Sequence, residues 1–145
     1  MPYIIENLKV TTIAVVTNCP AKWSAFEFNC YKVFYQSLSH EDAESFCQGE
    51  GGHLASIHSE EENMFVGNLS SGYLRLGATD KVYEGIFKWT DGSPFDFTSW
   101  FSYQPDDLLY EEDCVITNYG KPVRGLWNDV RCRQEDYIKK FVCKK

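Results

Sequence analysis

The 145-residue sequence lacks the short cysteine pairs that mark zinc ribbons and thioredoxin-like redox sites, because none of its six cysteines belongs to a Cys-x-x-Cys motif. An even number of cysteines in a chain of this length favours a disulfide framework, and hence an oxidising, secreted or extracellular location. Cys19 and Cys30 lie close together and suggest a local hairpin staple, whereas the other four cysteines must close larger loops. Spacing alone leaves many pairings open.

Positive charge is also scarce. The chain has 14 Lys and Arg against 21 Asp and Glu, with a net charge of −7, and its basic residues are scattered apart from a Lys144-Lys145 end. This balance argues against nucleic acid or an anionic membrane surface as partner, and it is compatible with cations. Long apolar runs are missing as well: "TTIAVV" is too short to span a bilayer, so no membrane insertion is expected.

The amino terminus does not resemble a signal peptide, since Glu6 and Lys9 interrupt it, and we take the chain as mature with its leader absent. Residues 1–18 contain β-favouring runs and are expected to be an extension: an edge strand, a contact in a homo-oligomer, or a disordered tail. Residues 19–145, rich in aromatic side chains, are expected to form one domain. Asn68 opens an N-x-S sequon and is a candidate glycosylation site.

Two segments predict helices. Ser39 is a candidate N-cap for residues 40–50, whose apolar side chains share one face before a glycine-rich end. Ser59 and Glu62 form an S-x-x-E capping box that opens residues 60–70. Farther on, the short apolar runs "YLRLGA", "IFKW", "CVIT" and "FVC" alternate with turn residues, which indicates strands and loops.

The span from about Lys88 to Glu112 has little regular pattern but many aromatic residues, so we expect a packed, function-bearing loop. Its end, "QPDDLLYEEDC", crowds five carboxylates into residues 104–114. Carboxylate and amide oxygens are the ligands that calcium prefers, and adjacent side chains of an extended segment can face two different ions. Asn128 and Asp129 add two oxygen ligands, and Asp80 and Glu84 form a further pair.

The alternative is a solvated acidic loop that binds nothing. The EF-hand pattern D-x-D-x-D-G is missing. A zinc site built from His53 and His58 is less favoured than ordinary surface and helix-start positions for these histidines. No nucleophile and base arrangement for catalysis is evident either, because Ser56 and His58 lack an apparent third partner.

Five stretches in order resemble a C-type lectin-like domain over about residues 19–145: "GGHLASIHSEEEN", "LGATD", "WTDGSPFDFTSW", "QPDD…EEDCV" and "WNDVRC…FVC". The resemblance implies an α+β fold, with two helices, two small antiparallel sheets and a long calcium-binding loop. It also implies a function: calcium-dependent binding of carbohydrate, without catalysis. The disulfides it implies are Cys47–Cys143, Cys114–Cys132 and the Cys19–Cys30 bridge of long-form members.

Carried over position by position, the resemblance implies two Ca²⁺ sites. The sugar-binding site comprises Gln104, Asp106, Glu112, Asn128 and Asp129, with Pro105 where the family uses a cis proline. An accessory site comprises Asp80, Glu84, Asp107 and Asp113. Trp127 is expected to pack in the core beneath the metal.

The order Gln-Pro-Asp resembles the family's galactose-type motif, which implies glycans with terminal galactose or related sugars as partners. Two positions depart from the family pattern. Leu108 stands where galactose-type members carry a Trp, so Tyr110 is the candidate stacking platform. Arg75 stands where a core strand commonly has Trp, and we expect it at a boundary. A mannose or broad-specificity lectin and a protein-binding or ice-binding module remain the alternatives.

Overall fold

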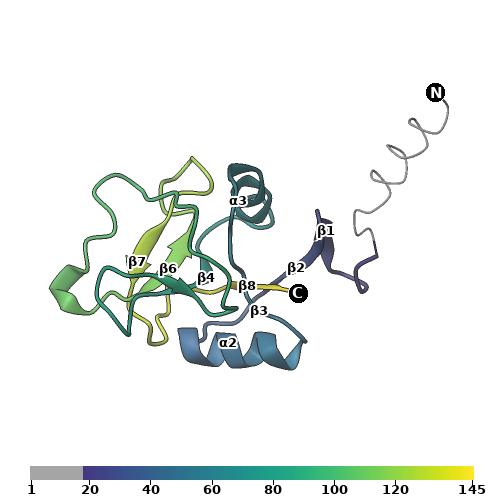
Figure 1. The fold of residues 1–145 in the computed structure, drawn as a ribbon, viewed down its shortest axis with the longest axis horizontal. Coiled ribbons are helices and arrows are strands. Elements are labelled where there is room, and N and C mark those ends of the chain that lie inside the picture. Colours follow the sequence, from purple (N-terminus) through teal and green to yellow (C-terminus); the bar gives the residue numbers. More distant parts are fainter. Residues whose placement is uncertain (1–17) are drawn as a thin grey trace.

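The computed structural model describes residues 18–145 (Figure 1). The predicted edge strand or oligomer contact in the extension therefore falls outside the described residues. In the described part the two helices lie on opposite sides of a central set of strands, with α2 below and α3 above them in the view of Figure 1.

Both predicted helices are present and begin at the predicted caps. Helix α2 (His40–Gly49) starts after Ser39, whose hydroxyl accepts the Asp42 amide at 3.0 Å. Helix α3 (Glu60–Gly67) starts after Ser59, whose hydroxyl accepts the Glu62 amide at 3.1 Å. The other half of the expected capping box is displaced by one residue, because the Glu62 carboxylate accepts the His58 amide at 2.8 Å.

Eight strands complete the described part. They are β1 (Ser24–Phe26), β2 (Asn29–Phe34), β3 (His53–Leu54), β4 (Leu74–Thr79), β5 (Lys88–Trp89), β6 (Cys114–Thr117), β7 (Asn128–Val130) and β8 (Phe141–Lys144). The main path runs β1-β2-β8-β4-β6-β7, with β3 paired to β8 and β5 to β4.

The expected α+β arrangement is present, with one difference in the strands. The β4–β8 pairing, between Arg75 and Phe141, is parallel and joins two otherwise antiparallel groups into one continuous mixed sheet. The Arg75 amide donates to the Lys140 carbonyl at 3.1 Å across this junction. The two groups expected as separate sheets are therefore held in a fixed relation to each other.

Each helix packs into its own part of the core. Val66 of α3 packs with Leu76, Trp127 and Val142, and α2 contributes Ala43 to a second cluster. That second cluster also contains Cys47, Leu54, Phe141 and Cys143. Burying a large apolar side chain stabilises the fold by about 1.5–3 kcal/mol, so both helices are fixed mainly by packing.

Three disulfides link the described residues in the pairing that the resemblance implied: Cys19–Cys30, Cys47–Cys143 and Cys114–Cys132. Cys47–Cys143 joins α2 to β8 across 96 residues of sequence. In the chain-entropy view a closure of this length stabilises the fold by roughly 4–5 kcal/mol.

Arg75 corrects one expectation, because it is fully buried at 1% exposure instead of lying at a boundary. Its guanidinium donates to the carbonyls of Leu38, Arg131 and Arg133 at 3.0, 3.2 and 2.6 Å. Burial lowers the pKa of Arg75 to about 10, so the side chain stays charged at neutral pH. The buried guanidinium is tolerated because its N–H donors bond these three carbonyls, and each carbonyl gains the hydrogen-bond donor that it needs.

Candidate functional site

The loop that carries the acidic residues follows β5 and is anchored on Trp127. The Phe101 amide donates to the Trp127 carbonyl and the Trp127 amide donates to the Ser99 carbonyl, both at 2.8 Å. The Trp127 indole is fully buried and donates to the Asn63 side-chain oxygen at 2.9 Å. The rings of Trp89, Phe95, Phe97 and Trp100 surround it with centroids 5.7–6.3 Å away. The predicted core packing of Trp127 is confirmed, and it gives the loop a rigid base.

One acidic cluster forms where the loop meets β7. Oxygens of Asp106, Glu112 and Asp129 all lie within 4.8 Å of one another. Asp129 is 1% exposed, and its two oxygens accept the amides of Asp106 and Asp107 at 3.1 and 2.7 Å. The carboxylate of Asp129 in β7 thus holds the loop in place. The Gln104–Pro105 peptide bond beside this cluster is cis, as the resemblance implied.

The amide oxygens near this cluster are buried without a protein partner. Among the described residues, six buried side-chain atoms lack a hydrogen bond, and three of them belong to predicted metal ligands: Gln104 Oε1, Asn128 Oδ1 and Asp80 Oδ1. Leaving such an oxygen unsatisfied costs about 1–3 kcal/mol. The all-oxygen donor set and these orphan oxygens together fit a hard divalent cation such as Ca²⁺.

A second acidic cluster brings together Asp80, Glu84 and Asp113, again with oxygens within 4.8 Å. Asp80 is buried, and its second carboxylate oxygen accepts the Gly85 amide at 2.8 Å. Asp107, expected in this set, lies outside the triad. It is next to Glu84, whose pKa it raises, and its Oδ1 accepts the Glu112 amide at 3.1 Å.

Burial and contacts between carboxyl groups raise pKa values in both acidic clusters. Burial, followed by the hydrogen bond to Asp106 and repulsion from Asp129, raises the pKa of Glu112 to about 7. The hydrogen bond to Asp80 is the main cause that raises the pKa of Glu84 to about 7. Burial raises the pKa of Asp113 and of Asp129. Without a counter-charge these clusters therefore retain protons that isolated carboxylates would lose.

The family model for the lectin C-type domain matches residues 36–145. The chain belongs to the C-type lectin family. None of the helices within residues 18–145 is long and apolar enough to cross a bilayer.

Versican core proteins are similar in sequence to this C-type lectin domain. The versican core proteins of rat and human are each 40% identical to it over 124 residues, which is 85% of this chain and 4% of theirs. This C-type lectin domain therefore spans only a small part of those relatives.

Two solved structures are similar over nearly the whole domain. The cow C-type carbohydrate-recognition domain of CD23, solved in the presence of a GlcNAc2Man3 oligosaccharide, is 30% identical with a TM-score of 0.81, covering 90% of this chain and 97% of that one. A calcium-independent type II antifreeze protein is 31% identical with a TM-score of 0.80, covering 91% of this chain and 95% of that one.

Two of the three histidines of this C-type lectin domain, His53 and His58, pair separately with acids. His53 Nδ1 lies 2.6 Å from Glu44, and His58 Nδ1 lies 2.8 Å from Asp96. No candidate metal group within residues 18–145 contains a histidine. Nothing in this part of the chain therefore supports the less favoured zinc site.

The expectation that Ser56 and His58 lack a third partner was wrong, because Asp96 pairs with His58 and Ser93 also lies 3.0 Å from its ring. Asp96 lies 38 residues from His58, so no local spacing signals the contact. Both serine hydroxyls donate to Asp91 at 2.5 Å, so they belong to a hydrogen-bond network around that carboxylate.

Two predicted functional side chains are exposed. Tyr110 lies in the short 3-10 turn η1 (Leu108–Tyr110), the green coil at the left of Figure 1, and is 91% exposed. Asn68 caps the C-terminus of α3 and is also exposed. Both positions are accessible for the roles expected of them.

Proposed function

We propose that this domain is a calcium-dependent carbohydrate-binding lectin with a preference for galactose-type sugars. The observation that supports this most is the pair of buried, unpartnered amide oxygens of Gln104 and Asn128 beside a triad of carboxylates. A solvated acidic loop would hydrate these oxygens, whereas a cation site requires them to be free of other partners.

In this proposal each acidic cluster holds one calcium ion. The first ion is held by Gln104, Asp106, Glu112, Asn128 and Asp129. The second is held by Asp80, Glu84, Asp107 and Asp113. Burial is the main cause of the raised pKa of Glu112, and the hydrogen bond to Asp80 is the main cause for Glu84, with like-charge repulsion adding to both. A divalent cation would favour the charged form of these carboxylates by Coulomb attraction.

When bound, the first ion supplies open coordination positions for two neighbouring sugar hydroxyls. The carboxylates of Asp106 and Glu112 then accept hydrogen bonds from those hydroxyls, and the amide nitrogens of Gln104 and Asn128 donate to them. Such bonds are charge-assisted and stronger than neutral ones. The exposed ring of Tyr110 is proposed to stack on the apolar face of the sugar.

The galactose preference rests on the order of amide and acid at Gln104 and Asp106, because this order fixes which side of the ion donates and which accepts. Exchanging them, with Gln104→Glu and Asp106→Asn together, should raise binding of mannose relative to galactose. An unchanged ratio of the two affinities would place the determinant of specificity elsewhere.

We infer no catalysis, because the residues of the two acidic clusters are used to hold calcium. The hydroxyls of Ser56 and Ser93, which lie beside His58, both donate to Asp91. The three disulfides support secretion to an extracellular location. One solvent-exposed sugar site binds weakly, so useful avidity would require several sites on one surface, for instance in a homo-oligomer.

Retention on galactose–agarose tests the proposal. The chain should bind in calcium and elute with EDTA, and Asp106→Ala or Asn128→Ala should abolish retention while the protein stays folded. Glu60→Gln removes an exposed carboxylate outside both clusters and serves as the control that should retain binding. Normal retention in either site variant would show that the site is misplaced.

A second candidate is a protein-binding or ice-binding module. It is favoured by the exposed apolar side chains of Leu108 and Leu109 in η1 and by the similarity to an antifreeze protein described as calcium-independent. Retention on galactose–agarose that ignores EDTA, or no retention at all with a folded protein, would favour this candidate over the lectin.

A further inference from the structure

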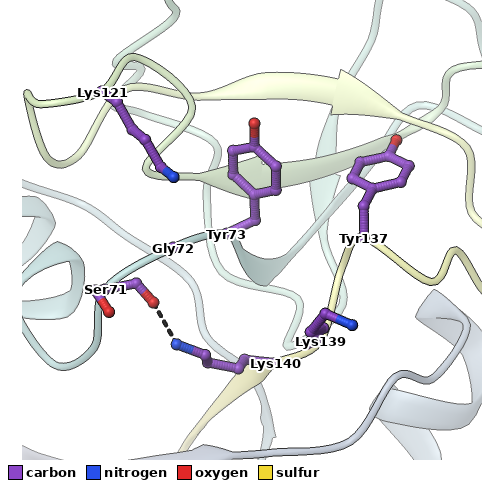
Figure 2. A pocket seen from close by; sticks show the side chains of 7 residues that line it. All are labelled: Ser71, Gly72, Tyr73, Lys121, Tyr137, Lys139 and Lys140. Atoms are coloured by element: carbon purple, nitrogen blue, oxygen red, sulfur yellow. Dashed lines mark hydrogen bonds between the residues drawn. The ribbon is translucent and has the colours of Figure 1, made fainter.

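A hollow of about 360 Å³ lies outside the acidic clusters and is lined by lysines and tyrosines. Its polar lining comes from Tyr73 ahead of β4, from Lys121, and from Tyr137, Lys139 and Lys140 ahead of β8. Figure 2 shows Lys121 and the Tyr73 and Tyr137 rings side by side in the upper part of the view. Lys139 and Lys140 lie below them, with the Lys140 ammonium turned toward Ser71.

A second hollow adjoins the first and extends its basic lining. It measures about 280 Å³, shares Ser71, Gly72 and Lys121 with the first, and adds Arg124. Together the two hollows present four cationic side chains, and no described residue that lines them is acidic. This basic lining contrasts with the chain as a whole, which has 21 acidic residues and a net charge of −7.

Lys121 and Lys139 are available for a ligand, whereas Lys140 already donates within the fold. Within residues 18–145 no carboxylate lies within 4.0 Å of the ammonium groups of Lys121, Lys139 or Lys140. Lys140 is oriented by the Ser70 hydroxyl at 2.9 Å and by the Ser71 carbonyl, so one of the three cations is held in place from within the fold.

The tyrosines add hydroxyl donors and flat apolar faces. Their rings meet edge to face with centroids 6.1 Å apart. Burial, with smaller contributions from Glu135 and Glu112, raises the pKa of Tyr137, so its hydroxyl stays protonated at neutral pH. Glu135 is itself paired with Arg133 at 3.0 Å, which reduces its repulsion of an anion in the hollow.

We propose that the two hollows bind a sulfated saccharide, with a sulfate ester between Lys121 and the Lys139–Lys140 pair and the sugar ring against Tyr137. Flexible lysines that line one hollow from two separate segments, Lys121 from one and Lys139 with Lys140 from the other, suit the several oxygens of a sulfate, whereas a planar carboxylate is better matched by an arginine fork. Arg124 lines the adjoining hollow, and its Nη1 is held by the Gly67 and Ser70 carbonyls at 3.1 and 3.0 Å. The rest of its guanidinium is proposed to bind a second acidic group of the same saccharide. This site is separate from the calcium clusters and does not depend on calcium.

The test measures binding in EDTA, which removes the contribution of the proposed calcium site. A heparin-derived tetrasaccharide should bind, while a hyaluronan tetrasaccharide, which carries carboxylates alone, should bind at least about ten-fold more weakly and dextran not at all. Equal binding of the carboxylate and sulfated chains would overturn the assignment of a sulfate site. Stronger binding of a sulfotyrosine peptide than of the tetrasaccharide would overturn the assignment of a saccharide.

A matched pair of double variants distinguishes binding at a specific site from general electrostatic attraction to the protein. The double variant Lys121→Gln with Lys139→Gln should weaken tetrasaccharide binding by about ten-fold or more. Lys22→Gln with Lys88→Gln removes the same charge from exposed positions outside both hollows and should change binding by no more than about two-fold, because solvent and salt screen distant charges. Equal losses in the two double variants would overturn the proposal.

A third variant examines the sugar platform. Tyr137→Ser should weaken tetrasaccharide binding by about three-fold or more, since a stacking face and a placed hydroxyl are lost without any change of charge. No change would contradict the docking position. All of these variants should keep calcium-dependent retention on galactose–agarose, so failure of one proposal is distinguishable from failure of the other.

Discussion

At the residue scale, the buried polar side chains divide by whether the protein itself satisfies them. Arg75 and Glu62 meet protein partners: Arg75 bonds three carbonyls, and the Glu62 carboxylate accepts from Tyr31 and from Lys144 at 2.6 Å. Gln104 and Asn128 keep orphan oxygens. The first kind stabilises the fold. The oxygens of Gln104 and Asn128 differ from the orphan atoms of His40, Trp89 and Thr117 because they lie beside an acidic cluster, where a cation could coordinate them.

Replacing Arg75 should be strongly destabilising. Arg75→Met fills a similar volume but leaves the carbonyls of Leu38, Arg131 and Arg133 without a donor, so we expect a loss of about 3 kcal/mol or more in urea unfolding. Arg75→Lys should lose less, because one ammonium can still reach some of these oxygens. A loss below about 1 kcal/mol for Arg75→Met would contradict the assigned role.

His40 predicts a pH dependence of stability. Burial, followed by the positive charge of Arg75, lowers the pKa of His40 to about 4; Lys81 acts in the same direction and Glu44 opposes it. The unfolded chain therefore binds a proton that the folded one does not between pH 6.5 and 4, so stability is full above pH 6.5 and falls below it. The contribution amounts to about 2 kcal/mol between pH 7 and pH 5.

His40→Gln isolates this effect from the titration of carboxylates. Its free energy of unfolding should fall less steeply than that of the native chain as the pH drops from 6.5 to 4.5. Parallel curves for the two proteins over that range would show that His40 does not titrate as its surroundings require.

At the scale of elements, the position of β4 depends on a close approach of Gly77 to the Leu54 backbone, which only glycine allows. A Cβ at Gly77 would lie 2.6 Å from the Leu54 carbonyl oxygen and 3.0 Å from the Thr90 hydroxyl. Gly77→Ala should therefore cost about 1–3 kcal/mol in thermal or urea unfolding, because backbone must move to admit the methyl group.

Gly49, at the end of α2, is the matched control. Nothing lies within 4 Å of a Cβ built there, so Gly49→Ala should be neutral or stabilising by up to about 1 kcal/mol. Equal destabilisation by the two alanine substitutions would mean that β4 is not confined as its contacts indicate.

The same elements show what a sequence reveals. Helix starts at Ser39 and Ser59 and the β6 run "CVIT" were predictable because caps and apolar runs are local signals. The short strand β3 (His53–Leu54) is defined by its pairing with β8, and no local sequence pattern predicts that pairing. Buried Arg75 was misplaced for a related reason: its carbonyl partners lie 37 to 58 residues away.

The candidate site was predicted in its residue types but not in its internal geometry. Family motifs identified Gln104 and Asn128, whereas their lack of protein partners is a property of the folded loop. Likewise no spacing rule indicates that Asp107 contacts the triad only through Glu84, or that lysines of two separate segments line one hollow with Tyr73 and Tyr137.

At the scale of the whole molecule, calcium should couple the long loop to the rest of the fold. A ligand that binds only the folded state at about 100 times its Kd stabilises it by about 2.7 kcal/mol. Saturating calcium should therefore raise the Tm by roughly 5–10 °C over the value in EDTA. Magnesium at the same concentration should give a smaller shift, since it demands stricter octahedral geometry. Equal Tm values in calcium and EDTA would contradict the proposed ion sites.

The most direct measurement is a crystal structure of the chain grown in millimolar calcium with galactose. We expect an ion among Gln104, Asp106, Glu112, Asn128 and Asp129, with two adjacent hydroxyls of the sugar within coordination distance of it. Density for neither ion nor sugar at these residues, or galactose bound elsewhere on the surface, would contradict the central claim that the ion itself forms the sugar-binding surface.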